Sequence, residues 1–206
     1  DSFENKNANF AVTFVVTDGW LKIDKNEAKV TVTIKGNKKT ETYTGTEKTV
    51  TDYTTEVTGA KGSEVNVALK ADAKAEAKGT NAGTYQMGLT KDSFKVTSNN
   101  YKNINVVVED GSLKINPAEV TVTITGNKKT DTYDGTEKSV TGYTSEKTNN
   151  LYTDADFGLK ADAKAKAKGT NAGTYQMGLT KDSFENKNAN FAVTFVVTDG
   201  WLKIDK

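Results

Sequence analysis

The chain has 206 residues, of which 35% are hydrophobic and 27% charged, and its formal net charge is +1. It contains no Cys and no His, and all 28 of its positive charges are Lys. This composition removes thiolate and histidine catalysis, disulfides, Cys/His metal sites and the bidentate Arg contacts that read phosphate or guanine. The mixed charge and the lack of a long apolar run predict no nucleic-acid partner and no membrane insertion, and we expect any signal or anchor to lie outside this sequence.

Internal repetition is the most distinctive feature of the chain. Residues 1–25 recur without change as residues 182–206, and a diverged copy occupies residues 92–116. Other stretches also recur, as Val30 to Ile34 does 90 residues later. A fixed period of this kind is typical of tandem arrays, which supply length and surface rather than one active site. We predict three segments: residues 1–25 as the C-terminal hairpin of a preceding repeat, 26–115 as a first full repeat and 116–206 as a second.

The copied segment predicts a β-hairpin. Its bulky apolar residues alternate along Phe10 to Val16, which indicates a half-buried strand. Asp18-Gly19 then predicts a two-residue turn, because both residue types tolerate the positive φ of a type I′ turn. Leu21 and Ile23 would return along the same core face. A lone hairpin is marginal in water, so we expect residues 1–25 to dock against the first full repeat or a symmetry partner.

Trp20 and Trp201 are the candidate ligand-binding residues. The hairpin register places Trp20 on the outward face, and the diverged copy has Ser112 at this position, so the fold does not require an aromatic there. An outward Trp can stack on a sugar, pack against a neighbouring repeat or simply be exposed. These readings stay open from the sequence.

Two further stretches predict strands in each repeat. Lys29 to Lys35 alternates, with Val30, Val32 and Ile34 on one face. From Val65 to Ala77 the small and apolar residues also alternate, although Ala, Lys and Glu favour helix. We interpret this stretch as strand. Because it is longer than most strands of a sandwich, we expect it to bend or to split in two.

Two kinds of structural motif recur in the two repeats. A turn followed by a strand is predicted at the Tyr-x-Gly sequences, and a corner is predicted where a Tyr at the start of a strand bonds back to the turn before it. In immunoglobulin-like sandwiches the core Cys follows that Tyr by two residues, and here Met takes its place. The residues concerned are Tyr43 and Gly45, Tyr133 and Gly135, Tyr85 and Met87, and Tyr175 and Met177. The predicted fold class is all-β, with tandem small β-sandwich (Ig-like) repeats of about 90 residues.

These motifs together resemble a known family. The sequences Tyr133-Asp134-Gly135, Gly79 to Tyr85, Thr17 to Ile23 and Ile115 to Glu119 look like the YDG or MBG type tandem repeats of bacterial cell-surface adhesins, which are common in Gram-positive and gut bacteria. The resemblance covers essentially the whole chain. It implies an extracellular, β-rich stalk module at the bacterial cell surface, and it carries over no catalytic residue.

Several other residues have side chains that suit either a functional site or a plain structural role. Oxygen donors at Glu64 and Asn66, and at Asp154 and Asp156, could join a calcium site or could be solvated. A Lys to Asn crosslink would suit a Cys-free surface protein, but no pair stands out in the sequence. Paired carboxylates for glycoside hydrolysis are disfavoured, because an enzyme seldom needs its whole site doubled in tandem. We predict no metal, cofactor or catalytic residue.

The leading functional hypothesis is a non-enzymatic spacer whose partners are the neighbouring repeats of the same protein. Short joints without Gly/Ser-rich or Pro-rich linkers predict a stiff rod. The alternative is an adhesive module that binds host glycan or mucin through Trp20 and Trp201. A straight, tightly jointed pair of repeats would favour the spacer, and a cleft between them would favour binding.

Overall fold

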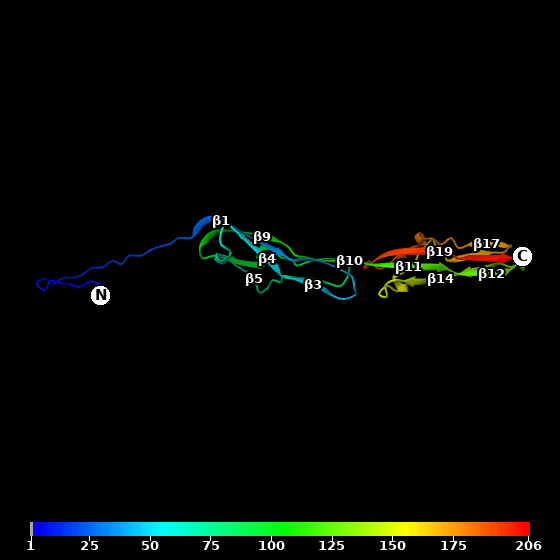
Figure 1. The fold of residues 1–206 in the computed structure, drawn as a ribbon, viewed down its shortest axis with the longest axis horizontal. Coiled ribbons are helices and arrows are strands. Elements are labelled where there is room, and N and C mark those ends of the chain that lie inside the picture. The colour runs from blue at the N-terminus through cyan, green and yellow to red at the C-terminus, as the bar shows by residue number, and fades with distance from the viewer. Residues whose placement is uncertain (1) are drawn as a thin grey trace.

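The computed structural model describes residues 2–206, which form β-strands and four short 3₁₀ helices and no α-helix. The predicted all-β class with two repeated units is confirmed. The units lie end to end along a thin rod, and residues 2–25 extend from one end of it (Figure 1). No helix among the described residues is long and apolar enough to cross a membrane.

Unit 1 contains ten strands and two 3₁₀ turns. They are β1 (Asn26–Gly36), β2 (Lys38–Thr42), β3 (Lys48–Thr51), β4 (Tyr53–Thr58), η1 (Gly62–Glu64), β5 (Asn66–Leu69), β6 (Glu76–Gly79), β7 (Gly83–Gln86), η2 (Lys91–Ser93), β8 (Phe94–Thr97), β9 (Tyr101–Glu109) and β10 (Ser112–Asn116).

Unit 2 repeats the same order. Its elements are β11 (Ala118–Gly126), β12 (Lys128–Thr132), β13 (Lys138–Thr141), β14 (Tyr143–Lys147), η3 (Asp154–Asp156), β15 (Phe157–Leu159), β16 (Lys166–Gly169), β17 (Gly173–Gln176), η4 (Lys181–Ser183), β18 (Phe184–Asn186), β19 (Phe191–Thr198) and β20 (Trp201–Asp205).

Each unit is divided along the rod into two lobes, and each lobe has a three-stranded and a two-stranded sheet. In unit 1 the leading lobe contains the sheets β4-β1-β9 and β5-β8, and the trailing lobe contains β2-β10-β7 and β3-β6. In unit 2 the corresponding sheets are β14-β11-β19 and β15-β18, then β12-β20-β17 and β13-β16. Each lobe has its own apolar cluster of buried residues.

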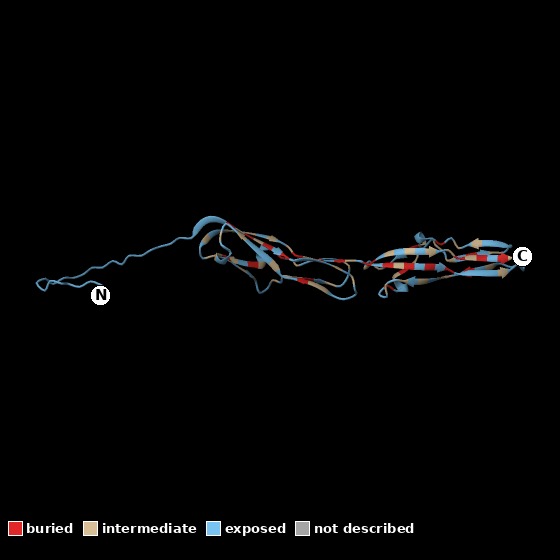
Figure 2. Cartoon of the chain, viewed as in Figure 1, coloured by how far each residue is buried: buried red, intermediate tan, exposed pale blue. Residues whose placement is uncertain are grey.

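Alternating side chains fill these cores, as the sequence predicts. Val30, Val32 and Ile34 in β1 are fully buried, while Thr31 and Thr33 between them are only partly covered. The resulting buried stripes follow the central strands of both units (Figure 2). The stretch from Val65 to Ala77 splits into β5 and β6 around a turn at Ala71 and Asp72, which confirms the expected break.

The predicted hairpin is wrong. In the copy at residues 182–206, β19 does not pair with β20: β19 runs parallel to β11, and β20 lies between β12 and β17. The predicted hairpin places Phe10 and Leu21 on one core face. Their copies Phe191 and Leu202 are both buried, but they lie in the cores of different lobes. The chain therefore crosses from one lobe to the next where the sequence predicts a reversal.

Glycine is needed at this point because two backbone segments cross at close range, and not because the chain turns. Neither Gly111 nor Gly200 has a positive φ, so neither meets the requirement of a type I′ turn. A β-carbon on Gly200 would overlap the backbone of Asn127 and Gly126, where β11 crosses into β12. The Asp before each glycine holds the neighbouring loop: Asp199 accepts hydrogen bonds from the backbone N–H groups of Gly178 and Leu179 at 3.0 and 2.8 Å.

The expected docking of residues 1–25 is also not observed. Residues 2–25 form no strand and are all exposed. Phe10, for example, is 67% exposed, whereas its copy Phe191 is 3% exposed. The reason is that the copy is buried by strands of its own unit, and in unit 1 the equivalent places are already filled by β8, β9 and β10.

Candidate functional site at the joint between the units

The two units are joined by a single residue. β10 ends at Asn116 and β11 begins at Ala118, with Pro117 between them. Proline fixes φ near −65° and carries no N–H, so it limits the rotation available at this point. Backbone hydrogen bonds hold both sides of the joint: Tyr43 N–H donates to Asn116 O at 2.9 Å, and Ala118 N–H donates to Asn190 O at 2.9 Å.

Beside this connection, two surfaces meet. We call the end of unit 1 its trailing face and the start of unit 2 its leading face. The trailing face consists of Tyr43, Gly45, Asn81 and Ala82. The leading face consists of Leu151, Tyr152, Asn190 and Phe191.

Tyr43 links the hydrophobic cores of the two units. Its ring meets Phe191 edge to face, with centroids 5.3 Å apart, and it packs against the trailing core of unit 1 and the leading core of unit 2. Phe191 in turn meets Tyr152 at 5.0 Å. Such aromatic pairs contribute about 0.5–1.5 kcal/mol beyond the area that they bury. The joint is therefore part of a continuous apolar core.

Asn190 connects the faces at a second point. Its Oδ1 accepts a hydrogen bond from the backbone N–H of Ala82 at 2.7 Å, and its Nδ2 donates to Asn81 Oδ1 at 3.1 Å. Asn81 belongs to the corner of unit 1, where Tyr85 Oη donates to Asn81 O at 3.0 Å. The corner thus presents a fixed N–H and a fixed amide to the next unit.

The Tyr-x-Gly loop shapes the trailing face. Gly45 has a φ of +76°, a backbone conformation that residues other than glycine rarely adopt. A β-carbon at this position would lie 3.7 Å from Leu151 Cδ1, so the loop approaches unit 2 to van der Waals distance. In unit 2 the same loop is formed by Tyr133, Asp134 and Gly135.

Tyr152 is the most deeply buried residue of the leading face. It is 1% exposed, and its hydroxyl donates to Asp156 O or Asn186 Oδ1 at 2.9 and 3.0 Å. Burial, and then the charge of Asp156, raise the pKa of Tyr152 to about 12. The phenol is therefore neutral at physiological pH and acts as a packed, hydrogen-bonded side chain.

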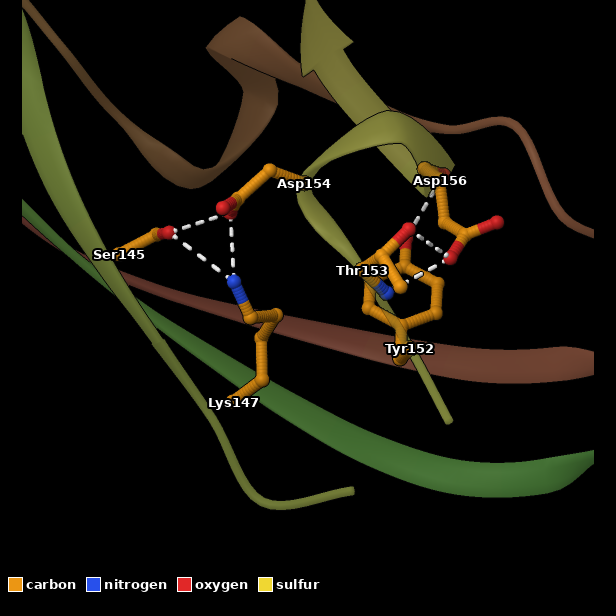
Figure 3. Close-up of polar contacts among 6 residues, drawn as sticks. All are labelled: Ser145, Lys147, Tyr152, Thr153, Asp154 and Asp156. Carbon is orange, nitrogen blue, oxygen red and sulfur yellow. Dashed lines mark hydrogen bonds and ion pairs between the residues drawn. The ribbon is translucent and has the colours of Figure 1, made fainter. Parts of the chain in front are cut away.

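A polar cluster holds the loop that carries Tyr152 (Figure 3). Asp156 Oδ2 accepts hydrogen bonds from the backbone N–H and the hydroxyl of Thr153 at 2.6 and 2.8 Å. Asp154 points away from Asp156 and accepts from Ser145 and Lys147. The hydrogen bond from Lys147, and then that from Ser145, lower the pKa of Asp154 below its ordinary value.

The cluster does not gather ligands for a cation. The Asp154 and Asp156 oxygens are directed to different partners, and among the described residues no group of three or more acidic side chains could hold a metal ion. In unit 1, Glu64 accepts from Asn100 Nδ2 and Tyr101 Oη. Structural hydrogen bonds therefore account for these carboxylates.

The structure does not bring the two candidate Trp residues together. Trp201 is partly buried in β20, beside Lys128 and Gln176 on the neighbouring strands. Trp20 is 81% exposed in the extended N-terminal segment. Met87 and Met177 are core residues that pack against both lobes of their units.

Sequence reasoning missed the residues that make the joint, apart from Tyr43 and Gly45. Asn81 and Asn190 are ordinary loop residues by their local pattern. For Leu151 and Tyr152 the sequence does contain a signal, because unit 1 has Lys61 and Gly62 at the aligned positions. The two repeats therefore differ in sequence at the surface that meets a neighbouring unit.

The repeated architecture and the interlocking ends define a tandem array of small all-β domains. Comparison with known families identifies these domains: the MBG domain matches residues 29–117 and 119–206. The chain therefore belongs to the MBG domain family, whose members occur in bacterial surface proteins and are generally non-catalytic. No curated protein and no solved structure gave a significant match.

Proposed function

We propose that this chain is a stalk: a non-enzymatic extracellular spacer of a bacterial surface adhesin that holds a distal binding domain away from the cell wall. The observation that carries the proposal is the joint. Units 1 and 2 are separated by one residue, share an apolar core through Tyr43, and are bridged at a second point by Asn190. In an array of such joints, each unit keeps a fixed orientation relative to the next, so the array stays extended.

Two contacts at different points make the joint resist bending. The Tyr43–Phe191 pair and the hydrogen bonds of Asn190 lie on separate loops of unit 1. Bending at Pro117 would open at least one of these contacts and expose buried apolar surface, which costs about 25 cal/mol per Å². Flexible Gly/Ser linkers carry no such cost.

Residues 1–25 fit this proposal as the last strands of a preceding unit. Their copy at residues 182–206 supplies β18, β19 and β20 to unit 2, including the buried Phe184, Phe191 and Ile204. In that arrangement the exposed apolar side chains of residues 1–25 become core residues. The domain frame is then the end of a preceding repeat at 1–25, followed by full repeats at 26–115 and 116–206.

Small-angle X-ray scattering of the 206-residue chain tests the stiffness that a spacer needs. We expect the double variant Tyr43→Ala, Asn190→Ala to be more compact on average, because its units sample bent arrangements. The matched control is Tyr133→Ala, Asn171→Ala: at the other end of the rod, Tyr133 is the counterpart of Tyr43, and Asn171 is the counterpart of Asn81, to which Asn190 is hydrogen-bonded. Equal scattering from all three chains would count against the spacer.

The alternative is binding of host glycan or mucin through exposed Trp. Titration with mucin glycans while Trp fluorescence is recorded separates the two functions. We expect no saturable change. Saturable binding that disappears in Trp201→Ala would replace the spacer with an adhesive module.

A further inference from the structure

The trailing face of unit 2 is open, although the equivalent face of unit 1 is covered. Tyr133 is 51% exposed, whereas its counterpart Tyr43 is packed between two cores. A β-carbon added at Gly135 would meet nothing within 4 Å, whereas one at Gly45 would contact Leu151. Ala172 is likewise more exposed than Ala82.

The open face has the same shape as the covered one. Gly135 has a φ of +80°, close to the +76° of Gly45. Tyr133 N–H donates to Asp205 O at 2.9 Å, as Tyr43 N–H does to Asn116 O. Tyr175 Oη donates to Asn171 O at 3.0 Å, which repeats the corner of unit 1. The backbone that docks a neighbour is therefore already formed.

The sequence difference in the loop does not disturb this shape. Asp134 stands where unit 1 has Thr44. Its carboxylate is paired with Lys138 and accepts hydrogen bonds from the backbone N–H and hydroxyl of Thr136 at 2.9 and 2.6 Å. The face consequently gains no unpaired charge that would repel an apolar partner.

We propose that the trailing face of unit 2, formed by Tyr133, Gly135, Asn171 and Ala172, is a docking surface for a further MBG unit that presents an Asn-aromatic pair equivalent to Asn190 and Phe191. The aromatic side chain packs on Tyr133. The amide oxygen of the Asn accepts a hydrogen bond from Ala172 N–H, and its amide nitrogen donates to Asn171 Oδ1. The inference rests on the proposed spacer function and names the partner that continues the rod.

The structure also indicates which leading face fits best. In unit 1, Asn100 and Tyr101 occupy the positions of Asn190 and Phe191, but both side chains are hydrogen-bonded to Glu64 of their own unit. The linker before unit 1 is two residues longer than that between the units. A leading face like that of unit 2, whose Asn190 side chain is directed across the joint, is therefore the partner that fits.

Amide hydrogen exchange measured by NMR tests this surface. In the 206-residue chain we expect Ala82 N–H to be protected and Ala172 N–H to exchange freely. A longer chain, in which residues 118–206 are repeated directly after Lys206, should slow the exchange of Ala172 about tenfold, the factor expected for one hydrogen bond. Replacing the added unit's counterpart of Asn190 with Ala should restore fast exchange.

The two proposals fail differently in this experiment. Protected Ala82 together with an Ala172 that exchanges equally fast in both chains would overturn the docking surface alone. Fast exchange of Ala82 in the 206-residue chain, unchanged by Asn190→Ala, would overturn the spacer joint and the docking surface with it.

Discussion

Asn190 and its counterpart Asn100 differ in what their side chains reach. Asn190 bonds across the joint to Asn81 and Ala82, whereas Asn100 bonds to Glu64 within its own unit. The backbone carbonyls of both accept from the first strand of the unit, at Ala118 and Asn26. An Asn side chain at this position of the repeat therefore bonds either to the neighbouring unit or within its own unit. The partners offered by the adjacent loop decide which of the two it does.

Identical Asp-Gly-Trp sequences at Gly19 and Gly200 provide a matched pair of substitutions. Gly200→Ala forces a β-carbon into the backbone of Asn127 and Gly126, and we expect a loss of about 1–3 kcal/mol in the free energy of unfolding of unit 2, as for other overpacked sites. Gly19→Ala, with nothing within 4 Å of the new β-carbon, should change stability by less than about 0.5 kcal/mol. Urea denaturation measures both, and equal effects would contradict the crossing.

Asp156 gives unit 2 a pH dependence. The backbone N–H of Thr153, then the Asn188 amide and the Thr153 hydroxyl, lower the pKa of Asp156. A lowered pKa means that the carboxylate stabilises the fold above its unfolded pKa of about 3.9. That stability is lost as the pH falls through the lower folded-state value.

We therefore expect Asp156→Asn to be less stable than the parent chain near neutral pH and to approach it in acid below about pH 3.9. Chemical denaturation across this pH range measures the difference between the two chains. A difference that stays constant as Asp156 is protonated would show that its hydrogen bonds do not favour the charged form.

At the scale of elements, the strands that cross between lobes decide the fold of each unit. β19 and β20 are separated by only Asp199 and Gly200, yet they belong to different sheets and different cores. Met177 packs against both cores, and its N–H donates to Gly200 O at 2.9 Å. The two lobes are therefore connected at the crossing by side-chain packing and by a backbone hydrogen bond, as well as by the chain itself.

Leu202 and Leu21 test the role of the copied strands. Leu202 is fully buried in the trailing core of unit 2, and Leu21 is 85% exposed. We expect Leu202→Ala to lower the free energy of unfolding by about 2–5 kcal/mol and Leu21→Ala to leave it within about 0.5 kcal/mol. Thermal unfolding of the two variants measures this contrast, which would vanish if residues 2–25 were packed on the rod.

The sequence predicts the elements better than it predicts their pairing. Alternation identifies β1 because Val30, Val32 and Ile34 face one core, and the corner at Tyr85 is a local motif with a local hydrogen bond. The Asp-Gly pair misleads because its preference for a turn is local, whereas the close approach of Gly200 to Gly126 is made by residues far apart in the chain. The joint was missed for the same reason: Asn81 and Asn190 are 109 residues apart.

At the scale of the whole molecule, the two units form one rod because the joint continues both the backbone and the core (Figure 1). Each unit adds its length in one direction, and its surface carries mixed Lys and acidic residues with a net charge of only +1 over the chain. These are properties of a spacer. We therefore expect the joint to hold the two units in a single arrangement in solution.

The chain has no Cys, so spin labels can be attached to Lys95→Cys in β8 and Glu185→Cys in β18, which are exposed positions on equivalent strands of the two units. Pulsed electron paramagnetic resonance then measures the distance between the units. We expect one narrow distance distribution, which broadens when Tyr43→Ala and Asn190→Ala are added. A broad distribution in the chain with an intact joint, or one that these substitutions leave unchanged, would contradict this expectation.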